Sequence, residues 1–119
     1  MNVAQGEYLL HQGEKGNDLY FIERGKLSIY LELENEERVR LQTLNMRTIV
    51  GELGLYLDRD RTASIIADKP SVVYRLSRSA LLEIKTKDPD LAAALHEFVA
   101  CLLAERLADT TRLLATLRN

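Results

Sequence analysis

A long stretch without a helix breaker limits the folds open to this chain. After Pro89 the sequence contains neither glycine nor proline up to Arg118, and Asp88 and Pro89 suit the N-cap and the first position of a helix. A helix over about 89–118 is therefore predicted, and its thirty residues span roughly 45 Å. A shorter helix over about 78–85 precedes it, with Ser77 as its N-cap.

The first 76 residues are instead typical of short strands, because glycines punctuate them and apolar residues alternate with polar ones. Strands are expected over residues 18–23, 26–33, 38–44, 62–67 and 71–76. Turns are expected at 23–26, where Gly25 supplies a positive φ, and at 68–70. Alternation in 26–33 and 38–44 predicts these inward-facing residues: Leu27, Ile29, Leu31, Leu33, Val39 and Leu41, with Thr43 as a further candidate.

The order of these elements predicts a fold that is mainly β with C-terminal helices. We expect a double-stranded β-helix (jelly-roll) barrel over 1–76, followed by a short helix and a long helix over 77–118. At 119 residues the chain is expected to form a single domain over 1–119.

Composition excludes several classes of protein. The net charge of −2 argues against a general nucleic-acid surface. The single cysteine, Cys101, permits no internal disulfide and no Cys-based metal cage, and it fits a reducing compartment. No stretch approaches the about 20 apolar residues of a membrane span, and the N-terminus lacks a signal peptide's basic and apolar regions. We therefore expect a cytoplasmic protein, or the cytoplasmic domain of a membrane protein.

Catalytic and metal-binding chemistry is not expected. There is no Ser/His/Asp set, and two histidines, His11 and His96, are too few for a cupin-type metal site. The expectation is a protein that is not an enzyme and that holds no metal or cofactor. The alternative of an isomerase or dioxygenase on a cupin barrel predicts a bound metal.

Charged residues gather in the expected hairpin around residues 32–40. Four glutamates there lie close in sequence to Arg38 and Arg40: Glu32, Glu34, Glu36 and Glu37. We interpret them as a solvated tip with weak ion pairs, since exposed pairs contribute roughly 0–1 kcal/mol.

The long helix has an unusually broad apolar side. At 100° per residue, about half of the helical wheel is covered by Leu91, Leu95, Phe98, Val99, Leu102, Leu103, Leu107, Leu114 and Leu117. A helix that packs only on one small barrel needs a narrower stripe. The extra face predicts a second partner, and a homodimer through this helix is expected, with a neighbouring domain as the alternative.

One local segment carries the functional signal. Gly51-Glu52-Leu53-Gly54-Leu55 is followed after a short spacer by Arg61-Thr62-Ala63-Ser64. Backbone N–H groups at a glycine turn bind anions, an arginine offers a planar fork of donors to phosphate, and a carboxylate accepts hydrogen bonds from ribose hydroxyls. The set suits a sugar with an attached phosphate. Alternatively, Arg61 pairs with Asp58 or Asp60, and Glu52 is only a helix N-terminal carboxylate.

These residues resemble the cyclic nucleotide-binding domain of the catabolite activator protein, of protein kinase regulatory subunits and of nucleotide-gated channels. The resemblance runs from about Gly6 to Ser79. It rests on Gly6, Gly13, Gly16, Tyr20-Phe21-Ile22, Gly25, and the phosphate-binding cassette of Val50-Gly51-Glu52-Leu53-Gly54-Leu55 with Arg61-Thr62-Ala63-Ser64-Ile65.

The resemblance implies a ligand, a 3′,5′-cyclic nucleotide, and a role for each cassette residue. Arg61 would grip the cyclic phosphate, and Glu52 would hold the ribose 2′-hydroxyl. The other implied contacts are the backbones of Gly51, Leu53, Gly54 and Thr62 or Ala63, and an apolar wall at Val50 and Val39. Thr62 follows the arginine, as in relatives that prefer cyclic GMP, whereas those that prefer cyclic AMP tend to carry alanine.

Two departures from the family pattern bear on affinity. Arg47 stands where the family usually has glycine, and Asp60 stands where it often has proline. They leave open an alternative in which the chain is a ligand-free dimerisation module of the same fold.

The function that the resemblance implies is regulatory: nucleotide binding is coupled to an attached effector. The helical segment that normally precedes the barrel is missing, so we expect a piece of a longer protein. Bacterial members with a similar Arg-Thr-Ala-Ser cassette and a long final helix occur at the cytoplasmic end of sulfate-type anion transporters, which makes such a transporter the expected parent. No nucleic acid is expected to bind this domain alone.

Overall fold

The computed structural model describes residues 1–44, 46–57 and 59–118, with Leu53 described by its backbone alone. These residues form two compact units, Met1–Ala80 and Leu81–Asn119. The first unit carries the strands and a short helix, and the second consists of helical residues.

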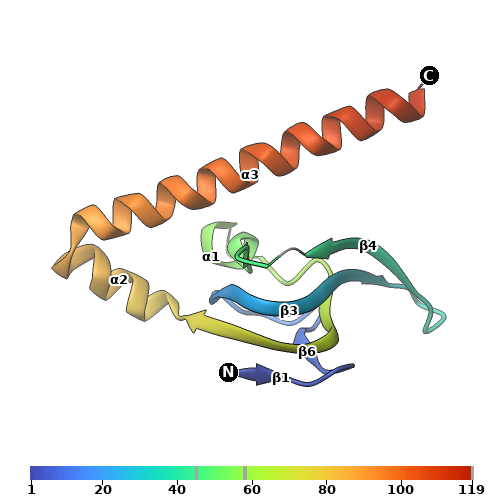
Figure 1. Ribbon diagram of the computed structural model, residues 1–119, viewed down its shortest axis with the longest axis horizontal. Helices are drawn as coiled ribbons and strands as arrows, with labels where there is room; N and C mark the ends of the chain where they lie inside the picture. The colour runs from blue at the N-terminus through green and yellow to red at the C-terminus, as the bar shows by residue number, and fades with distance from the viewer. Residues whose placement is uncertain (45, 58, 119) are drawn as a thin grey trace. The chain divides into compact units, whose positions relative to one another are not determined.

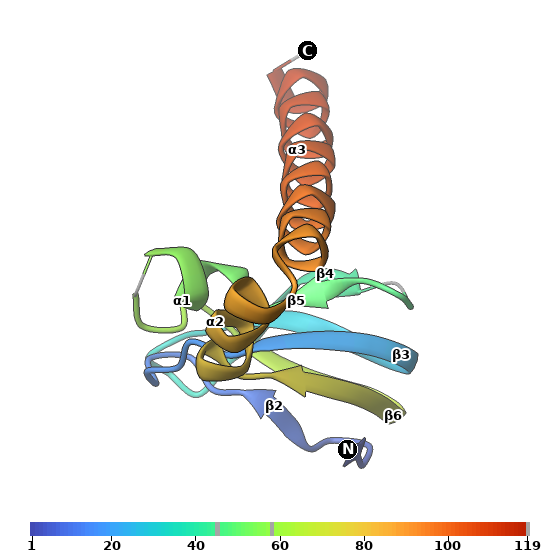
Figure 2. The same ribbon diagram turned by 90° about the vertical axis from the view of Figure 1, so that its left-hand side faces the viewer.

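The strands form an antiparallel sheet with the order β1-β6-β3-β4 (Figure 1). Their bounds are β1 (Asn2–Val3), β2 (Tyr8–Leu10), β3 (Leu19–Glu32), β4 (Arg38–Leu44), β5 (Ile49–Val50) and β6 (Ser64–Leu76). Strand β2 also pairs with β6, beside which it lies in Figure 2, and β5 pairs with β3. The mainly β fold with C-terminal helices is confirmed, but in the described part of the chain the sheet does not close into a barrel.

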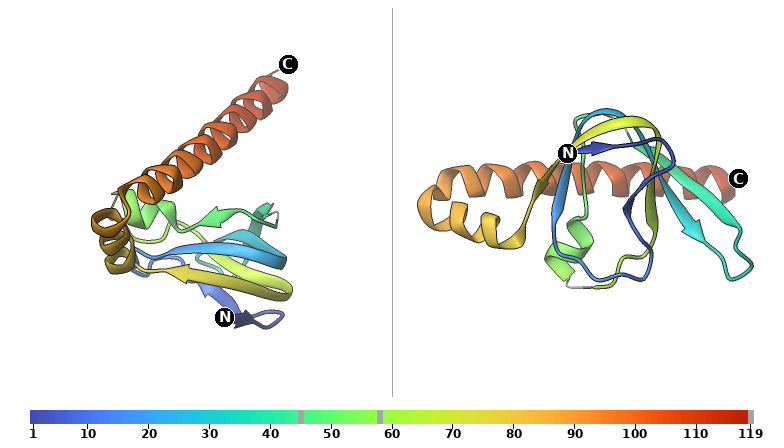
Figure 3. Two further views of the ribbon diagram at one scale, coloured as in Figure 1. Left: turned by 60° about the vertical axis from the view of Figure 1, so that its left-hand side comes forward. Right: turned by 90° about the horizontal axis from the view of Figure 1, so that it is seen from below.

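The two turns expected inside the long strands are wrong. β3 runs through Gly25 and β6 runs through Pro70, and the two strands curve together in the right-hand view of Figure 3. The pairing register shifts on both sides of Arg24, and Gly25 has a φ of 112°. A Cβ at Gly25 would collide with Ser71. Glycine and proline therefore mark a bulge that bends paired strands, where both residues are tolerated.

The apolar core of the first unit comes from both long strands and their neighbours. Its buried members are Val3, Leu10, Ile22, Leu27, Leu44, Val50, Ile65, Ala67 and Val73. Leu27 of β3 and Val73 of β6 are fully buried. Burying a side chain of this kind contributes about 1.5–3 kcal/mol, so the β3–β6 pair supplies the framework on which the cassette is held.

Strand β4 corrects the expected inward face. Val39 and Leu41 are 47% and 56% exposed, and Leu33, beyond the end of β3, is also exposed. β4 pairs only with β3 among the described strands, so one side of it lacks a strand neighbour. Val39 does lie opposite Leu31, but a register shift beyond Ile29 places Gln42 and Leu44, rather than Leu41 and Thr43, opposite Ile29 and Leu27. Alternation within each strand could show neither this shift nor that this end of the sheet is uncovered.

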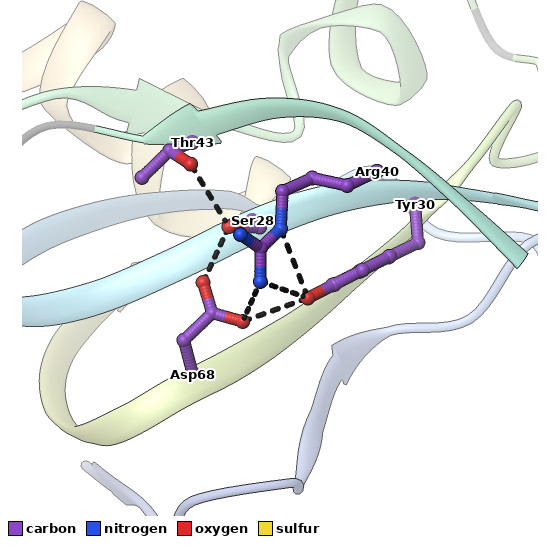
Figure 4. A network of polar contacts seen from close by, with 5 residues as sticks. All are labelled: Ser28, Tyr30, Arg40, Thr43 and Asp68. Atoms are coloured by element: carbon purple, nitrogen blue, oxygen red, sulfur yellow. Dashed lines mark hydrogen bonds and ion pairs between the residues drawn. The ribbon is translucent and has the colours of Figure 1, made fainter.

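Polar side chains tie β3, β4 and β6 together (Figure 4). The Asp68 network consists of Ser28, Tyr30, Arg40, Thr43 and Asp68. The Asp68 carboxylate accepts hydrogen bonds from the hydroxyls of Ser28 and Tyr30, and Arg40 lies 3.4 Å from it. Arg40 also donates to the Tyr30 hydroxyl, at 3.0 Å from Nη2. Arg40 is exposed, as expected, but its partners are Tyr30 and Asp68 rather than the glutamates of the tip.

The helices begin at the expected caps. Helix α1 covers Glu52–Leu57, α2 covers Arg78–Lys87 and α3 covers Pro89–Arg118. Ser77 accepts a hydrogen bond from the Ala80 N–H at 3.1 Å, and Asp88 accepts one from the Leu91 N–H at 3.1 Å. α2 extends two residues beyond the expected end. Among the described residues, no helix combines the length and apolar content that crossing a membrane requires.

Candidate functional site

The cassette is a glycine turn between β5 and α1. Gly51 has a φ of 91°, a backbone conformation that residues with a side chain rarely adopt. Its carbonyl accepts the first helical hydrogen bond, from the Leu55 N–H at 3.4 Å. A Cβ at Gly51 would collide with the Asp18 carbonyl. Both the conformation and the close approach therefore require glycine at this position.

Arg61 reaches this turn from the segment just before β6. The residue is only 9% exposed. Its Nη1 donates to the Gly51 carbonyl at 3.1 Å, and its Nη2 lies 3.4 Å from the Asp18 carbonyl. The guanidinium is thus held against the backbone of the turn that precedes Glu52.

Two further glycines complete the space around this guanidinium. A Cβ at Gly16 would lie 2.8 Å from Arg61 Nη2, and one at Gly54 would lie 2.7 Å from Nη1. A Cβ at Gly54 would also collide with the Gly16 carbonyl, so Gly16, Gly51 and Gly54 bring their backbones close to the guanidinium. We call these three residues with Arg61 the arginine cradle.

The Arg61 guanidinium in the arginine cradle donates its hydrogen bonds to neutral carbonyl groups. Over residues 1–44, 46–57 and 59–118, no carboxylate lies within ion-pair distance of Arg61. The predicted alternative pairing with Asp60 is therefore wrong, and Asp58 lies outside the described residues. Asp18 directs its carboxylate to Arg75, at 3.1 Å, and only its carbonyl to Arg61. A buried cation without a carboxylate partner favours an anionic ligand.

The other predicted site residues occupy different environments. Glu52 is 9% exposed at the start of α1. Leu53 contributes its backbone to α1, Thr62 is exposed and Ala63 is half-buried, both before β6 begins. Val50 belongs to the buried core, so of the two residues expected to form an apolar wall only Val39 exposes much surface.

The sequence profile of the family "Cyclic nucleotide-binding domain" matches residues 1–88. The chain belongs to this family. The match covers the sheet and the cassette, which carry the resemblance expected over about Gly6–Ser79, and it also extends over α2.

Curated relatives of this cyclic nucleotide-binding domain include a kinase and a transcription regulator. The cGMP-dependent protein kinase egl-4 of Caenorhabditis briggsae is 37% identical over 81 residues, which are 66% of this chain and 11% of the kinase. The cAMP-activated global transcriptional regulator CRP of Escherichia coli is 30% identical over 104 residues, which are 87% of this chain and 48% of the regulator. The chain thus spans about half or less of each.

Solved structures share the fold. A cyclic nucleotide-binding domain from Methylobacillus flagellatus KT superposes with a TM-score of 0.84 at 24% identity, over 91% of this chain and 61% of that one. The similarity establishes that the cyclic nucleotide-binding domain fold, including its C-terminal helices, is present here.

The arginine cradle also includes one residue, Gly16, that was not expected to belong to the site. Gly16 belongs to the family pattern, and its backbone lies against the Arg61 guanidinium. Its signal was the second glycine in Gln-Gly-Glu-Lys-Gly.

Within the described residues, no group of three His, Cys, Asp or Glu side chains is arranged to hold a metal ion.

Proposed function

We propose that this domain binds a 3′,5′-cyclic nucleotide at the cassette and relays its presence to an attached effector. Arg61 binds the cyclic phosphate and Glu52 binds the ribose 2′-hydroxyl. Gly51, Leu53, Gly54, Thr62 and Ala63 supply backbone contacts. The whole chain, residues 1–119, acts as one regulatory domain without catalytic chemistry of its own.

The observation that carries this proposal is the arginine cradle. A guanidinium presents its donors as a planar fork, and two phosphate oxygens match that fork. Arg61 uses one N–H of Nη1 for the Gly51 carbonyl, at 3.1 Å, and the weaker Nη2 contact to Asp18 is 3.4 Å long. Its charge meets no carboxylate among the described residues, so a phosphodiester would supply the opposite charge.

Binding should be measured by calorimetric titration of the 119-residue chain with cyclic AMP and with cyclic GMP. We expect the wild type to bind one of them below millimolar concentration, and Arg61→Ala and Glu52→Ala to lose the binding. Arg24→Ala is the matched control, since it also removes one positive charge but makes no contact with the cassette. Circular dichroism confirms that each variant is folded.

The same titration tests the ligand-free alternative. No heat with either nucleotide, together with a stable dimer in sedimentation, would favour a dimerisation module. Loss of binding in Arg24→Ala to the same degree as in Arg61→Ala would also contradict the proposed site.

The preferred base is proposed to be guanine. Thr62 is exposed directly after Arg61, and its hydroxyl can accept a hydrogen bond from the exocyclic amine of guanine. Thr62→Ala should then weaken cyclic GMP binding several-fold and leave cyclic AMP binding unchanged. Thr62→Ser, which keeps the hydroxyl, should retain the preference.

A homodimer through α3 is part of the proposal. This helix exposes large apolar side chains along its length, among them Leu91, Phe98, Leu107, Leu113, Leu114 and Leu117. Exposed apolar surface on a helix favours association with a second copy. Sedimentation of the wild type and of Leu107→Glu/Leu114→Glu should give a dimer and a monomer, respectively.

The attached effector is proposed to be a sulfate-type anion transporter, with this domain on its cytoplasmic side. The support is the resemblance of the cassette and the long final helix to those of such transporters. The sequence of the full-length gene tests this directly: membrane-spanning segments upstream of the domain are expected, and another effector would replace the transporter in the proposal.

A further inference from the structure

The side chain of Gln12 takes the place of a strand neighbour at the end of β3. The pairing of β3 with β6 ends at Tyr30 of β3 and Ser64, the first residue of β6. Glu32, two residues further along β3, therefore has no β6 residue beside it. Gln12 Nε2 donates to the Glu32 carbonyl at 3.0 Å, and the Glu32 N–H donates to Gln12 Oε1 at 2.8 Å. One primary amide thus satisfies both backbone groups of Glu32, as a paired residue would.

Ser64 and the Glu32 carboxylate fix Gln12 from another direction. The Gln12 N–H donates to Ser64 Oγ at 2.9 Å, and this fully buried hydroxyl donates to the Glu32 carboxylate at 2.7 Å. Tyr8 also donates to that carboxylate, at 2.6 Å. Hydrogen bonds from Tyr8 and Ser64 lower the pKa of Glu32. We call Gln12, Glu32 and Ser64 the Gln12 anchor, and it corrects the interpretation of Glu32 as part of a solvated tip.

The residues that follow Gln12 contact Arg61 directly. The Gly13 N–H donates to the Arg61 carbonyl at 2.7 Å, and the Arg61 N–H donates to the Glu14 carbonyl at 2.8 Å. Two residues later, Gly16 lies against the Arg61 guanidinium. The short segment 12–16 therefore joins the Gln12 anchor at one end to the arginine cradle at the other.

We propose that Gln12 is a positioning residue for Arg61, holding segment 12–16 so that Arg61 presents its guanidinium to the phosphate of the ligand. This proposal rests on the proposed function for the role of Arg61. The proposal also gives a role to Ser64, the last residue of the Arg-Thr-Ala-Ser motif. No ligand contact is proposed for this residue.

A positioning role differs from a general contribution to stability, and the Asp68 network provides the contrast. That network also joins the long strands, through the buried Ser28 and the half-buried Tyr30 and Asp68 (Figure 4). None of its hydrogen bonds involves segment 12–16 or Arg61. Weakening the Asp68 network should lower the stability of the fold without moving the Arg61 guanidinium. Weakening the Gln12 anchor should lower the stability and also move the guanidinium.

The test compares Gln12→Ala with the matched control Tyr30→Phe in the full 119-residue chain. Cyclic nucleotide affinity is measured by calorimetry, and amide hydrogen exchange at Gly13 and Arg61 is measured by NMR without ligand. We expect Gln12→Ala to weaken binding about tenfold and to speed exchange at both amides about tenfold or more. Tyr30→Phe should change neither by more than about twofold.

A double-mutant cycle shows whether Gln12 acts through Arg61. In an Arg61→Lys background the affinity loss from Gln12→Ala should shrink to less than about twofold, because the fork that it positions is gone. An equal loss in both backgrounds, or unchanged exchange at Gly13 and Arg61, would overturn the proposal. If Gln12→Ala does not fold, Gln12→Glu replaces it, since the carboxylate keeps the acceptor for the Glu32 N–H and loses the donor to the carbonyl.

Failure of the proposed function is recognised separately. If the wild type binds neither cyclic nucleotide, the proposed ligand is contradicted. The exchange rates in the free protein then test only whether the Gln12 anchor holds segment 12–16. Faster exchange at Gly13 and Arg61 in Gln12→Ala supports the anchor, and wild-type rates refute it.

Discussion

Arg40 and Arg61 carry the same group in two opposite settings. Arg40 is half-exposed, and its charge is matched within the chain by Asp68 at 3.4 Å and by the Tyr30 hydroxyl at 3.0 Å. Arg61 is buried among glycines and bonds to the carbonyls of Gly51 and Asp18. This difference supports the proposal that Arg61, which is buried without a carboxylate partner, meets a ligand, whereas Arg40 belongs to a structural network.

Replacing each arginine by lysine should give the largest difference between the two sites in cyclic nucleotide affinity. Arg61→Lys loses the planar fork, and we expect cyclic nucleotide affinity to fall about a hundredfold, or about 2.7 kcal/mol. Arg40→Lys should leave affinity within about twofold of the wild type. Calorimetric titration measures both, and an equal loss in the two variants would remove the distinction between the sites.

The glycine setting of Arg61 can be tested with a matched pair. Gly51 and Gly6 both have a positive φ, of 91° and 82°, but a Cβ meets the Asp18 carbonyl only at Gly51 and finds nothing within 4 Å at Gly6. Gly51→Ala should therefore lower the free energy of unfolding by about 2 kcal/mol more than Gly6→Ala. Urea unfolding gives this difference, and equal losses would show that strain in φ alone matters.

Removing the carboxylate beside Arg40 should affect stability and not binding. Asp68→Ala removes the main acceptor of the fully buried Ser28 hydroxyl and leaves it only the longer contact to Thr43 Oγ1, at 3.4 Å, so we expect the free energy of unfolding to fall by about 1.5 kcal/mol. Nucleotide affinity should remain unchanged, as measured on the same preparation. A loss of affinity would join the Asp68 network to the binding site after all.

Lowering the pH should weaken the Asp68 network, and this is the smallest of the expected effects. Burial raises the pKa of Asp68, but hydrogen bonds from Ser28 and Tyr30 and the charges of Arg40 and Lys26 lower this pKa overall. A carboxyl with a lowered folded-state pKa stabilises the fold above its unfolded pKa of about 4, and this stabilisation disappears as the pH falls through the folded-state value. The urea midpoints of the wild type and Asp68→Asn should therefore converge between pH 7 and pH 3. A constant separation would contradict this assignment.

The sequence predicted features that depend on neighbouring residues. Ser77 and Asp88 were placed as caps because an N-cap acts within three residues, and both caps form. The spacing of the cassette likewise identified the family before the glycines were seen to surround Arg61. The ligand contacts themselves stay predictions.

Features that depend on distant pairing were missed. Gly25 and Pro70 read as turns because a bulge becomes visible only when β3 and β6 are paired. Glu32 looked solvated because its partners, Gln12 and Ser64, are 20 and 32 residues away in sequence. Val39 and Leu41 alternate as a buried strand does, and only the sheet order reveals that β4 lies at its end.

The Gln12 anchor also limits how the chain can vary in length. Gln12 and Gly16 are held at both ends of a short surface segment, so an inserted residue between them would shift the glycine away from the guanidinium. The tip over residues 33–37 is closed by hydrogen bonds between Leu33 and its near neighbours Glu36 and Glu37, and it can lengthen freely. Of these two surface loops, only the tip can accept a peptide tag or a reporter without disturbing the cassette.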